Sequence, residues 1–181
     1  MTYTLILMGS YPDMQERIYK EIQTVLGNQD RDLTKEDLPK LLYLEAVLKE
    51  SMRLYPPAPT TRSIQSDVQL KNYVLPAGST CLIGLYGINR HPMWGADAEQ
   101  YKLQRWLDPS SLPDNPNAFA SFSLGRRNCI GRLYSMMVMK TMLALIFRKY
   151  RVIGDVHSIP TQCDILIKPA TSKQIRIELR T

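Results

Sequence analysis

The chain has 181 residues, of which 44% are hydrophobic and 22% charged, a composition that suits one folded domain or part of one and excludes intrinsic disorder. The formal net charge is +6, but the basic residues are scattered, so nucleic acid is not expected as a partner. The three cysteines lie far apart and match neither a disulfide framework nor a zinc finger, which indicates a reducing compartment.

The chain begins with a short apolar run over residues 1–8. This run lacks the basic region and cleavage site of a signal peptide and is too short to span a membrane. Pro12 suits the first turn of a helix, and apolar residues then recur at helical spacing as far as Gly27. The pattern predicts an amphipathic helix over residues 12–26.

A second helix is predicted over residues 41–54. Thr34 and Asp37 precede it and resemble a capping box, which satisfies free N–H groups at the start of a helix. Pro56 and Pro57 follow it, and proline stops a helix because it lacks an N–H group and clashes with the preceding turn. Helical content is therefore concentrated in the first third of the chain.

The middle of the chain has a shorter periodicity. Strands are predicted over residues 68–70, 73–75 and 80–86, which together indicate a small sheet within residues 62–88. Residues 89–121 are rich in proline and have no period, so we expect an irregular but packed segment, and loops this long usually serve function.

The last third is predicted to hold one helix and one hairpin. Residues 133–147 are apolar almost all round, which indicates a buried helix too short to span a bilayer. Residues 175–180 alternate between apolar and charged, and we expect them to pair with residues 163–168 in a hairpin over 163–180. The predicted fold class is mainly α with small β-sheets (α+β).

Residues 122–131 carry the strongest functional signal. Cys129 lies between glycine and arginine residues, just before the long apolar helix. A cysteine at a helix amino terminus beside arginines favours the thiolate, the form that binds metals. Gly125 and Gly131 permit a tight backbone that can approach a flat ligand, and the N–H groups of such a loop can donate to the sulfur. The segment therefore predicts that Cys129 is a metal ligand.

Two other interpretations of Cys129 are open. A buried, inert thiol is the commoner fate of a single cysteine, although the flanking glycines and arginines argue against it here. A nucleophilic cysteine enzyme would need a histidine, and neither His91 nor His157 stands in a recognisable triad motif.

The pattern Phe-x-x-Gly-x-Arg-x-Cys-x-Gly over residues 122–131 resembles the haem-binding loop of the cytochrome P450 family of haem-thiolate monooxygenases. The resemblance implies haem b, iron protoporphyrin IX, as the cofactor, with Cys129 as the proximal axial ligand of its iron. It also implies that Arg127 lies at a haem propionate and that Phe122 packs beneath the ring. Thiolate ligation of this kind favours cleavage of the O–O bond.

Glu50 and Arg53 lie three positions apart on the second predicted helix, where they face the same side. In the family, a Glu-x-x-Arg pair before a proline-rich turn forms a buried network with a third arginine, and Arg105 resembles that arginine. Leu103 and Gln104 replace the proline and glutamate that the family has beside it. The extra arginine matters because a buried pair needs further partners to offset desolvation.

Arg62 matches a family position that commonly reaches a haem propionate, while an exposed arginine at a strand edge is the open alternative. The same resemblance implies that further residues border the substrate pocket. They are Ala58, Pro59, Thr60 and Thr61 after the proline-rich turn, and Ala170 and Thr171 at the tip of the predicted hairpin.

The resemblance makes residues 1–181 the carboxy-terminal portion of a single cytochrome P450 domain, closest to the microsomal insect-type and fatty-acid-hydroxylase branch. Its expected parts are the end of the long oxygen-activating helix (1–9), helices that include Glu-x-x-Arg (12–57), a small sheet (62–88), a meander (89–121), the haem-binding loop (122–131), a buried proximal-side helix (132–150) and a hairpin (163–180).

The implied function is insertion of one oxygen atom of O₂ into an apolar small-molecule substrate, with electrons from NADPH through a flavoprotein reductase. The full-length protein is expected to be anchored in the endoplasmic reticulum membrane on its cytosolic face, with the mitochondrial inner membrane as the alternative. The acid-alcohol motif of the oxygen-activating helix is not found in this sequence. We therefore expect the isolated chain to bind haem weakly, to aggregate and not to turn over substrate. The competing interpretation is a catalytically inactive haem-binding or structural fragment.

Overall fold

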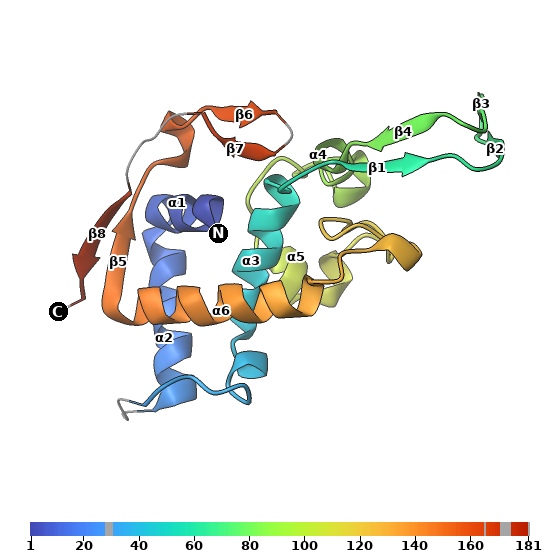
Figure 1. Cartoon of the computed structure of the whole chain (residues 1–181). Coiled ribbons are helices and arrows are strands. Elements are labelled where there is room, and N and C mark those ends of the chain that lie inside the picture. The colour runs from blue at the N-terminus through green and yellow to red at the C-terminus, as the bar shows by residue number, and fades with distance from the viewer. Residues whose placement is uncertain (28–30, 165, 171–174, 181) are drawn as a thin grey trace.

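The computed structural model describes residues 1–27, 31–164, 166–170 and 175–180. Helices make up most of its regular structure, and small antiparallel sheets lie around them (Figure 1). Each sheet that the described residues form has two strands. The predicted fold class, mainly α with small β-sheets, is therefore confirmed.

The chain starts with two consecutive helices, α1 (Thr2–Ser10) and α2 (Pro12–Leu26). Pro12 occupies the first turn of α2, where an N–H group would have no acceptor within the helix, so its absence in proline costs no hydrogen bond. Gly27 ends the helix. The predicted amphipathic helix is confirmed. No helix within the described ranges is long and apolar enough to cross a membrane.

The third long helix, α3 (Leu42–Leu54), begins against the side of α2. Glu21 of α2 supplies its cap, because Oε1 accepts from the N–H of Tyr43 at 2.6 Å and Oε2 accepts from the N–H of Leu44 at 2.9 Å. A carboxylate suits this position, since the first N–H groups of a helix are free and carry partial positive charge. The predicted helix over residues 41–54 is confirmed.

The predicted capping box at Thr34 and Asp37 does not cap α3. Asp37 instead accepts a hydrogen bond from the N–H of Thr34 at 3.0 Å and pairs with Arg31 at 2.6 Å. These contacts close a turn that leads into the short 3-10 helix η1 (Leu38–Lys40). The prediction is wrong because η1 separates the turn from α3, whose free N–H groups are already bound by a carboxylate from α2.

The longest helix, α6 (Arg132–Lys149), runs across α2 and α3 (Figure 1). Its buried side chains begin only near the middle of the helix and are Lys140, Leu143, Ala144 and Phe147. In the first half, Leu133 is 79% and Tyr134 is 74% exposed. The predicted helix is confirmed, but the prediction that it is buried is wrong for its first half. The reason is that α3 and α2 cross α6 beyond its first turns and cover only one side (Figure 1).

The hydrophobic core lies where α1, α2, α3 and the second half of α6 meet. Its largest fully buried apolar side chains are Ile6, Leu7, Met8, Ile18, Ile22, Leu41, Leu44, Leu48, Leu143 and Phe147. Interiors of this kind are close-packed, so the positions of the helices are fixed by shape as well as by hydrophobicity.

Residues 89–121 form an irregular but packed segment, as predicted. Its short helical pieces are η2 (Pro92–Trp94), α5 (Gln104–Leu107) and η3 (Pro109–Ser111). Trp106 lies at the centre of a small aromatic cluster, with ring centroids 5.8 Å from Trp94 and 4.9 Å from Phe119. The segment therefore has a core of its own despite its lack of sequence period.

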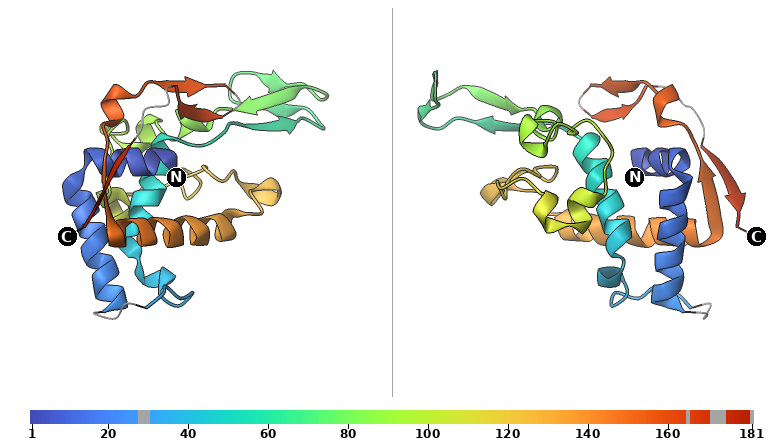
Figure 2. Two further views of the ribbon diagram at one scale, coloured as in Figure 1. Left: turned by 60° about the vertical axis from the view of Figure 1, so that its left-hand side comes forward. Right: turned by 180° about the vertical axis from the view of Figure 1, so that it is seen from behind.

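The strands that follow α3 form an arm that extends away from the helices (Figures 1 and 2). Strand β1 (Thr60–Ser63) pairs antiparallel with β4 (Thr80–Ile83). Beyond them, β2 (Val68–Gln69) pairs with β3 (Val74–Leu75). The small sheet predicted within residues 62–88 is confirmed, although its first strand starts at Thr60.

The strand predicted over residues 80–86 stops at Ile83. The carbonyl of Gly84 accepts from the N–H of Gly87 at 3.1 Å and of Ile88 at 3.2 Å, which turns the chain into the short helix α4 (Leu85–Ile88). A short apolar run does not distinguish a strand from a helix by its period. The strand prediction is therefore wrong after Ile83.

The last strand, β8 (Arg176–Leu179), pairs antiparallel with β5 (Tyr150–Ile153), which follows α6 without a loop. The hairpin predicted over residues 163–180 is therefore wrong. The alternation of apolar and charged residues correctly identifies β8 as a strand, but it does not show which strand β8 pairs with. Its partner β5 is held at the core by the buried side chain of Val152.

The predicted partner of β8 belongs to a separate pair of strands. Strand β6 (Thr161–Cys163) pairs with β7 (Ile167–Pro169), and the 3-10 helix η5 (Val156–Ser158) connects β5 to β6. Residues 171–174, which include half of the predicted hairpin turn at residues 169–172, lie outside the described residues.

Helix α1 and the start of α2 lie against β5 and the segment after it. The buried side chain of Gln15 binds both backbone groups of Val152, because Nε2 donates to the carbonyl at 2.9 Å and Oε1 accepts from the N–H at 2.8 Å. The hydroxyl of Ser10 accepts from the N–H of Val156 at 2.8 Å. The two ends of the chain are therefore joined by hydrogen bonds as well as by apolar packing.

Substitution of Gly9 with alanine should destabilise the fold by about 1–3 kcal/mol. A Cβ atom at Gly9 would lie 2.3 Å from the nitrogen and 2.8 Å from the Cα of Gly154, and these backbone atoms cannot rotate away. Urea unfolding measures the change. Gly87→Ala is the matched control, because no atom lies within 4 Å of a Cβ there. Equal stabilities of the two variants would show that α1 does not need this close approach.

Candidate functional site

Residues 122–131 form a closed loop just before α6. The N–H of Cys129 donates to the carbonyl of Phe122 at 2.8 Å, which joins the two ends of the loop. The 3-10 helix η4 (Gly125–Arg127) makes the turn between them, and Gly125 has a φ of 73°, in the left-handed region that favours glycine. The shape of the loop thus depends on its own backbone bonds and on Gly125.

The loop presents Cys129 at the surface. Its thiol is free and exposed, which argues against a buried, inert cysteine, and it lies two positions before Gly131, the N-cap residue of α6. A Cβ at Gly131 would lie 3.8 Å from the Cys129 sulfur, so the glycine leaves that side of the sulfur open. Within the described part of the chain, no three His, Cys, Asp or Glu side chains cluster to hold a metal ion.

Arg62 reaches this loop from β1. Its Nη2 donates to the hydroxyl of Ser123 at 2.8 Å and to the carbonyl of Arg127 at 3.1 Å. Arg62 therefore does not end at a free strand edge, and the structure brings it to the segment that holds the cysteine. The Arg127 residue is exposed, and Phe122 is half-buried at the base of the loop.

Glu50 and Arg53 form a buried ion pair on α3. Two nitrogens of Arg53 each lie 2.8 Å from an oxygen of Glu50, and both side chains are 0% exposed. Arg53 also donates to the carbonyls of Asn89 at 2.7 Å and Ala98 at 2.6 Å. These further bonds offset the desolvation that an isolated buried pair would suffer.

The structure places Arg105 beside this pair. Its Nε lies 3.7 Å from Glu50 Oε1, and its terminal nitrogens donate to the carbonyl of Trp94 and to both the carbonyl and the carboxylate of Asp97. The three residues that the resemblance joined in one network are therefore in contact. Leu103, at the position of the family's proline, is buried and does not displace Arg105.

The sequence does not predict two more partners of Glu50. The indole N–H of Trp106 donates to Oε2 and the backbone N–H of Lys102 donates to Oε1, both at 2.9 Å. The only available signal was the aromatic residue directly after Arg105. With these donors, both oxygens of the carboxylate are fully used.

The network extends to the base of the cysteine loop through Asn89. The backbone carbonyl of Asn89 accepts from Arg53, and the side-chain amide nitrogen of Asn89 donates to the hydroxyl of Ser121 at 3.0 Å. Ser121 in turn donates to the carbonyl of Met52 at 2.9 Å. Ser121 directly precedes Phe122, where the loop closes. The network is therefore structural, and it fixes the point from which the loop projects.

Asp97→Asn should remove a stability contribution that depends on pH. Hydrogen bonds from Lys102, at 2.6 Å, and from Arg105 lower the pKa of Asp97 to about 2. The unfolded value is about 3.9, so ionised Asp97 stabilises the fold above this value, and the contribution is lost as the pH falls from about 4 to about 2. Urea unfolding of both proteins should show their difference in unfolding free energy shrinking over this window. A constant difference would contradict the ion pair.

The predicted substrate-pocket residues lie before and in β1 and after β7. They are Ala58, Pro59 and Thr60, which are half-buried, and Thr61 and Ala170, which are exposed. The N–H of Ile167 donates to the carbonyl of Pro57 at 2.9 Å, so β7 lies beside the chain that enters β1. The start of β7 therefore lies beside the proline-rich turn, while the N–H of Ala170 donates to the carbonyl of Pro160 at 2.8 Å. Thr171 lies outside the described residues.

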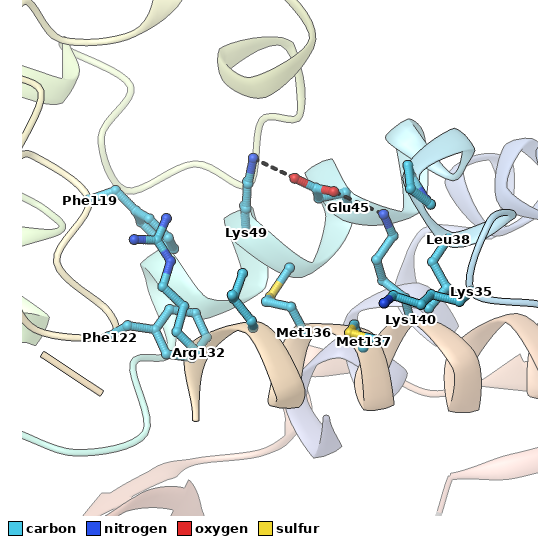
Figure 3. Close-up of a pocket in the computed structure, with 12 residues that line it drawn as sticks. Lys35, Leu38, Glu45, Lys49, Phe119, Phe122, Arg132, Met136, Met137 and Lys140 are labelled. Carbon is cyan, nitrogen blue, oxygen red and sulfur yellow. Dashed lines mark hydrogen bonds and ion pairs between the residues drawn. The ribbon is translucent and has the colours of Figure 1, made fainter. Parts of the chain in front are cut away.

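A groove of about 380 Å³ opens between α3 and α6 beside the loop (Figure 3). Phe122 and Met136 line it, and Glu45 pairs there with Lys49 at 2.7 Å and with Lys140 at 2.9 Å. Burial alone would raise the pKa of Glu45, but the hydrogen bonds from the two lysines outweigh burial and lower the pKa.

The wall of this groove carries an excess of positive charge. Besides the two lysines that share Glu45, it includes Lys35 and Arg132, which form no ion pair within the described ranges. Charge complementarity would favour an anionic surface or ligand here. The sequence does not predict this groove, because its cations come from three separate segments.

Comparison with known proteins gives a consistent result. A family model described as Cytochrome P450 matches residues 1–176. Cytochrome P450 4V2 of Rattus norvegicus is 32% identical over 183 residues, which cover 99% of this chain and 35% of that protein. Cytochrome P450 4g15 of Drosophila melanogaster is 34% identical over 185 residues, with coverage of 99% and 32%. Cytochrome P450 4F12 of Homo sapiens is 33% identical over 181 residues, with coverage of 98% and 34%. The chain therefore spans about a third of the length of these curated relatives.

Proposed function

Because the chain belongs to the cytochrome P450 family, we propose that the loop over residues 122–131 holds haem b, with the Cys129 thiolate as the proximal axial ligand of the iron. The observation that carries this proposal is an exposed thiol in a loop closed by its own backbone at Phe122. The lack of a competing cluster of metal-ligating side chains in the described residues supports it.

The residues around the loop suit a flat cofactor that is apolar at its centre and anionic at its edge. Ile130, directly after the cysteine, and Leu124, in the same loop, are exposed apolar residues that such a ring would cover. Arg62 and Arg127 supply positive charge for two carboxylates, which arginine binds well. In this arrangement, the two arginines would hold the haem propionates and Phe122 would pack beneath the ring.

The whole protein, in this proposal, is a monooxygenase that inserts one oxygen atom of O₂ into an apolar small-molecule substrate. When haem is bound, its thiolate ligation favours cleavage of the O–O bond. This chain supplies the ligand through Cys129 and holds the loop in place through the Glu50 network. The segments 58–61 and 170–171 border the substrate. The reaction belongs to the whole protein, since the chain spans about a third of its relatives.

Electrons would reach the haem from NADPH through a flavoprotein reductase. The positively charged groove next to the loop supports an electron donor with an acidic surface. By the same family resemblance, we assign the whole protein to the endoplasmic reticulum membrane, with this part on the cytosolic face.

Titration of the purified chain with haem tests the proposed function. The expected result is a reduced carbonyl complex whose Soret band is that of a thiolate-ligated haem. A saturated complex with the spectrum of free or nitrogen-ligated haem would contradict Cys129 as the ligand.

A further inference from the structure

We propose that Arg62 is a positioning residue that clamps the cysteine loop to β1 in the haem-free chain, so that the loop is ordered before the cofactor binds. That the clamp prepares the loop for haem rests on the proposed function. The contact itself is a property of the chain and is tested without haem.

The guanidinium of Arg62 bridges two separate segments. Its Nη1 donates to the hydroxyl of Thr60 and to the carbonyl of Thr61, both at 2.7 Å, which fixes the side chain on β1. Its Nη2 donates to the hydroxyl of Ser123 and the carbonyl of Arg127, at 2.8 and 3.1 Å, which holds the loop. Four of the five N–H groups of an arginine are thus used by the chain itself.

The loop has few other ties to the rest of the molecule. Its internal hydrogen bonds run from the N–H of Cys129 to the carbonyl of Phe122 at 2.8 Å and from the N–H of Asn128 to the carbonyl of Gly125 at 3.1 Å. Residues 124–130 are all exposed. Among the described residues, Arg62 is the one whose side chain makes hydrogen bonds to the loop from outside it.

The clamp acts at the most constrained residue of the loop. Ser123 has a φ of 60°, and it is the one residue other than glycine with a positive φ in the described part of the chain. L-residues with a side chain disfavour this conformation. The bond from Arg62 to the Ser123 hydroxyl holds the residue there, and this places the carbonyl of Phe122 where the N–H of Cys129 can reach it.

A clamp differs from a residue that supplies only charge to a haem carboxylate. A charge-only role would be kept by lysine and would have no effect on the haem-free chain. A clamp needs the planar fork of arginine, because one lysine ammonium cannot reach acceptors on two segments with the same geometry. Arg62→Lys therefore separates the two roles.

Hydrogen exchange of the haem-free chain, resolved to single amides, tests the clamp. The amides of Asn128 and Cys129 should exchange about tenfold faster in both Arg62→Gln and Arg62→Lys, as expected for the loss of two hydrogen bonds to the loop. Ser123→Ala, which removes one acceptor, should give a smaller increase of about threefold. Arg126→Gln is the matched control, since it makes the same charge change on an exposed residue of the loop, and it should change exchange by less than about twofold.

Several results would overturn the clamp. If these two amides exchange as slowly in Arg62→Lys as in the unchanged chain, charge alone matters. If they exchange equally fast in Arg62→Gln and in Arg126→Gln, the contact does not order the loop. If Arg62→Gln also accelerates the amides of α3, the variant has lost its fold. The milder variant Ser123→Ala then tests the clamp, and unchanged exchange of the loop amides in that variant rejects it. A saturated haem complex of the unchanged chain that lacks the spectrum of thiolate ligation, with the expected exchange pattern intact, would instead contradict the proposed function.

Discussion

Loss of the thiolate-type Soret band is the expected result of Cys129→Ala. The thiol of Cys129 is exposed, and the described hydrogen bonds of this residue are made by its backbone. The loop should therefore keep its closed form without the sulfur. The free energy of unfolding should change by less than about 0.5 kcal/mol, as for most exposed positions. The reduced carbonyl spectrum and urea unfolding of the same preparations measure both effects.

Cys163→Ala is the matched control for this experiment. Cys163 is also free and exposed, but it lies on β6, outside the cysteine loop. This variant should keep the band. Retention of the band in Cys129→Ala would assign the iron to another ligand, and its loss in both variants would point to a general effect of removing thiols.

A large loss of stability is the expected result of Glu50→Ala. The substitution would leave the guanidinium of Arg53 buried without its carboxylate, and it would also remove the acceptor of the Trp106 indole and of the Lys102 N–H. Removing one partner of a buried pair typically costs about 3–5 kcal/mol, which is a large share of the total stability of a domain. Urea unfolding at neutral pH measures this cost.

Glu99→Ala is the surface counterpart of Glu50→Ala. Glu99 pairs with Arg90 at 2.9 Å, but its side chain is 74% exposed, so its loss should cost less than about 1 kcal/mol. Similar costs for the two variants would mean that the Glu50 network does not hold the core. Because Asn89 and Ser121 connect this network to the loop, Glu50→Ala should also weaken haem binding.

The helices could be predicted from the sequence because their signals are local. The apolar spacing and Pro12 define α2, and α3 ends at its predicted boundary and begins one residue after its predicted start. The predictions that failed concern which segments contact each other. Alternation in residues 175–180 cannot show that β8 pairs with β5, and nothing near α3 in the sequence shows that Glu21 caps it. The apolar composition of α6 likewise does not show which of its sides its neighbours cover.

The candidate site divides in the same way. Cys129, Gly125 and the buried Glu50–Arg53 pair lie in short patterns that can be read along the chain. Trp106 and Asp97 add contacts to the network that only the folded chain assembles. The contacts of Arg62 with Ser123 and Arg127 join positions more than sixty residues apart, so no local pattern could have predicted them.

The hydrogen bonds between α1, α2 and the segment around β5 also set an order for synthesis. Val152 follows its partner Gln15 by 137 residues along the chain, and Val156 follows its partner Ser10 by 146 residues. Helices can form locally within this time, whereas contacts between distant residues come late. The side of α1 that packs on β5 and η5 therefore stays uncovered until these residues have been made, and a chaperone that binds apolar segments can hold it during this time. The contacts of α1 and α2 with this segment close only after Val152 and Val156 have been made.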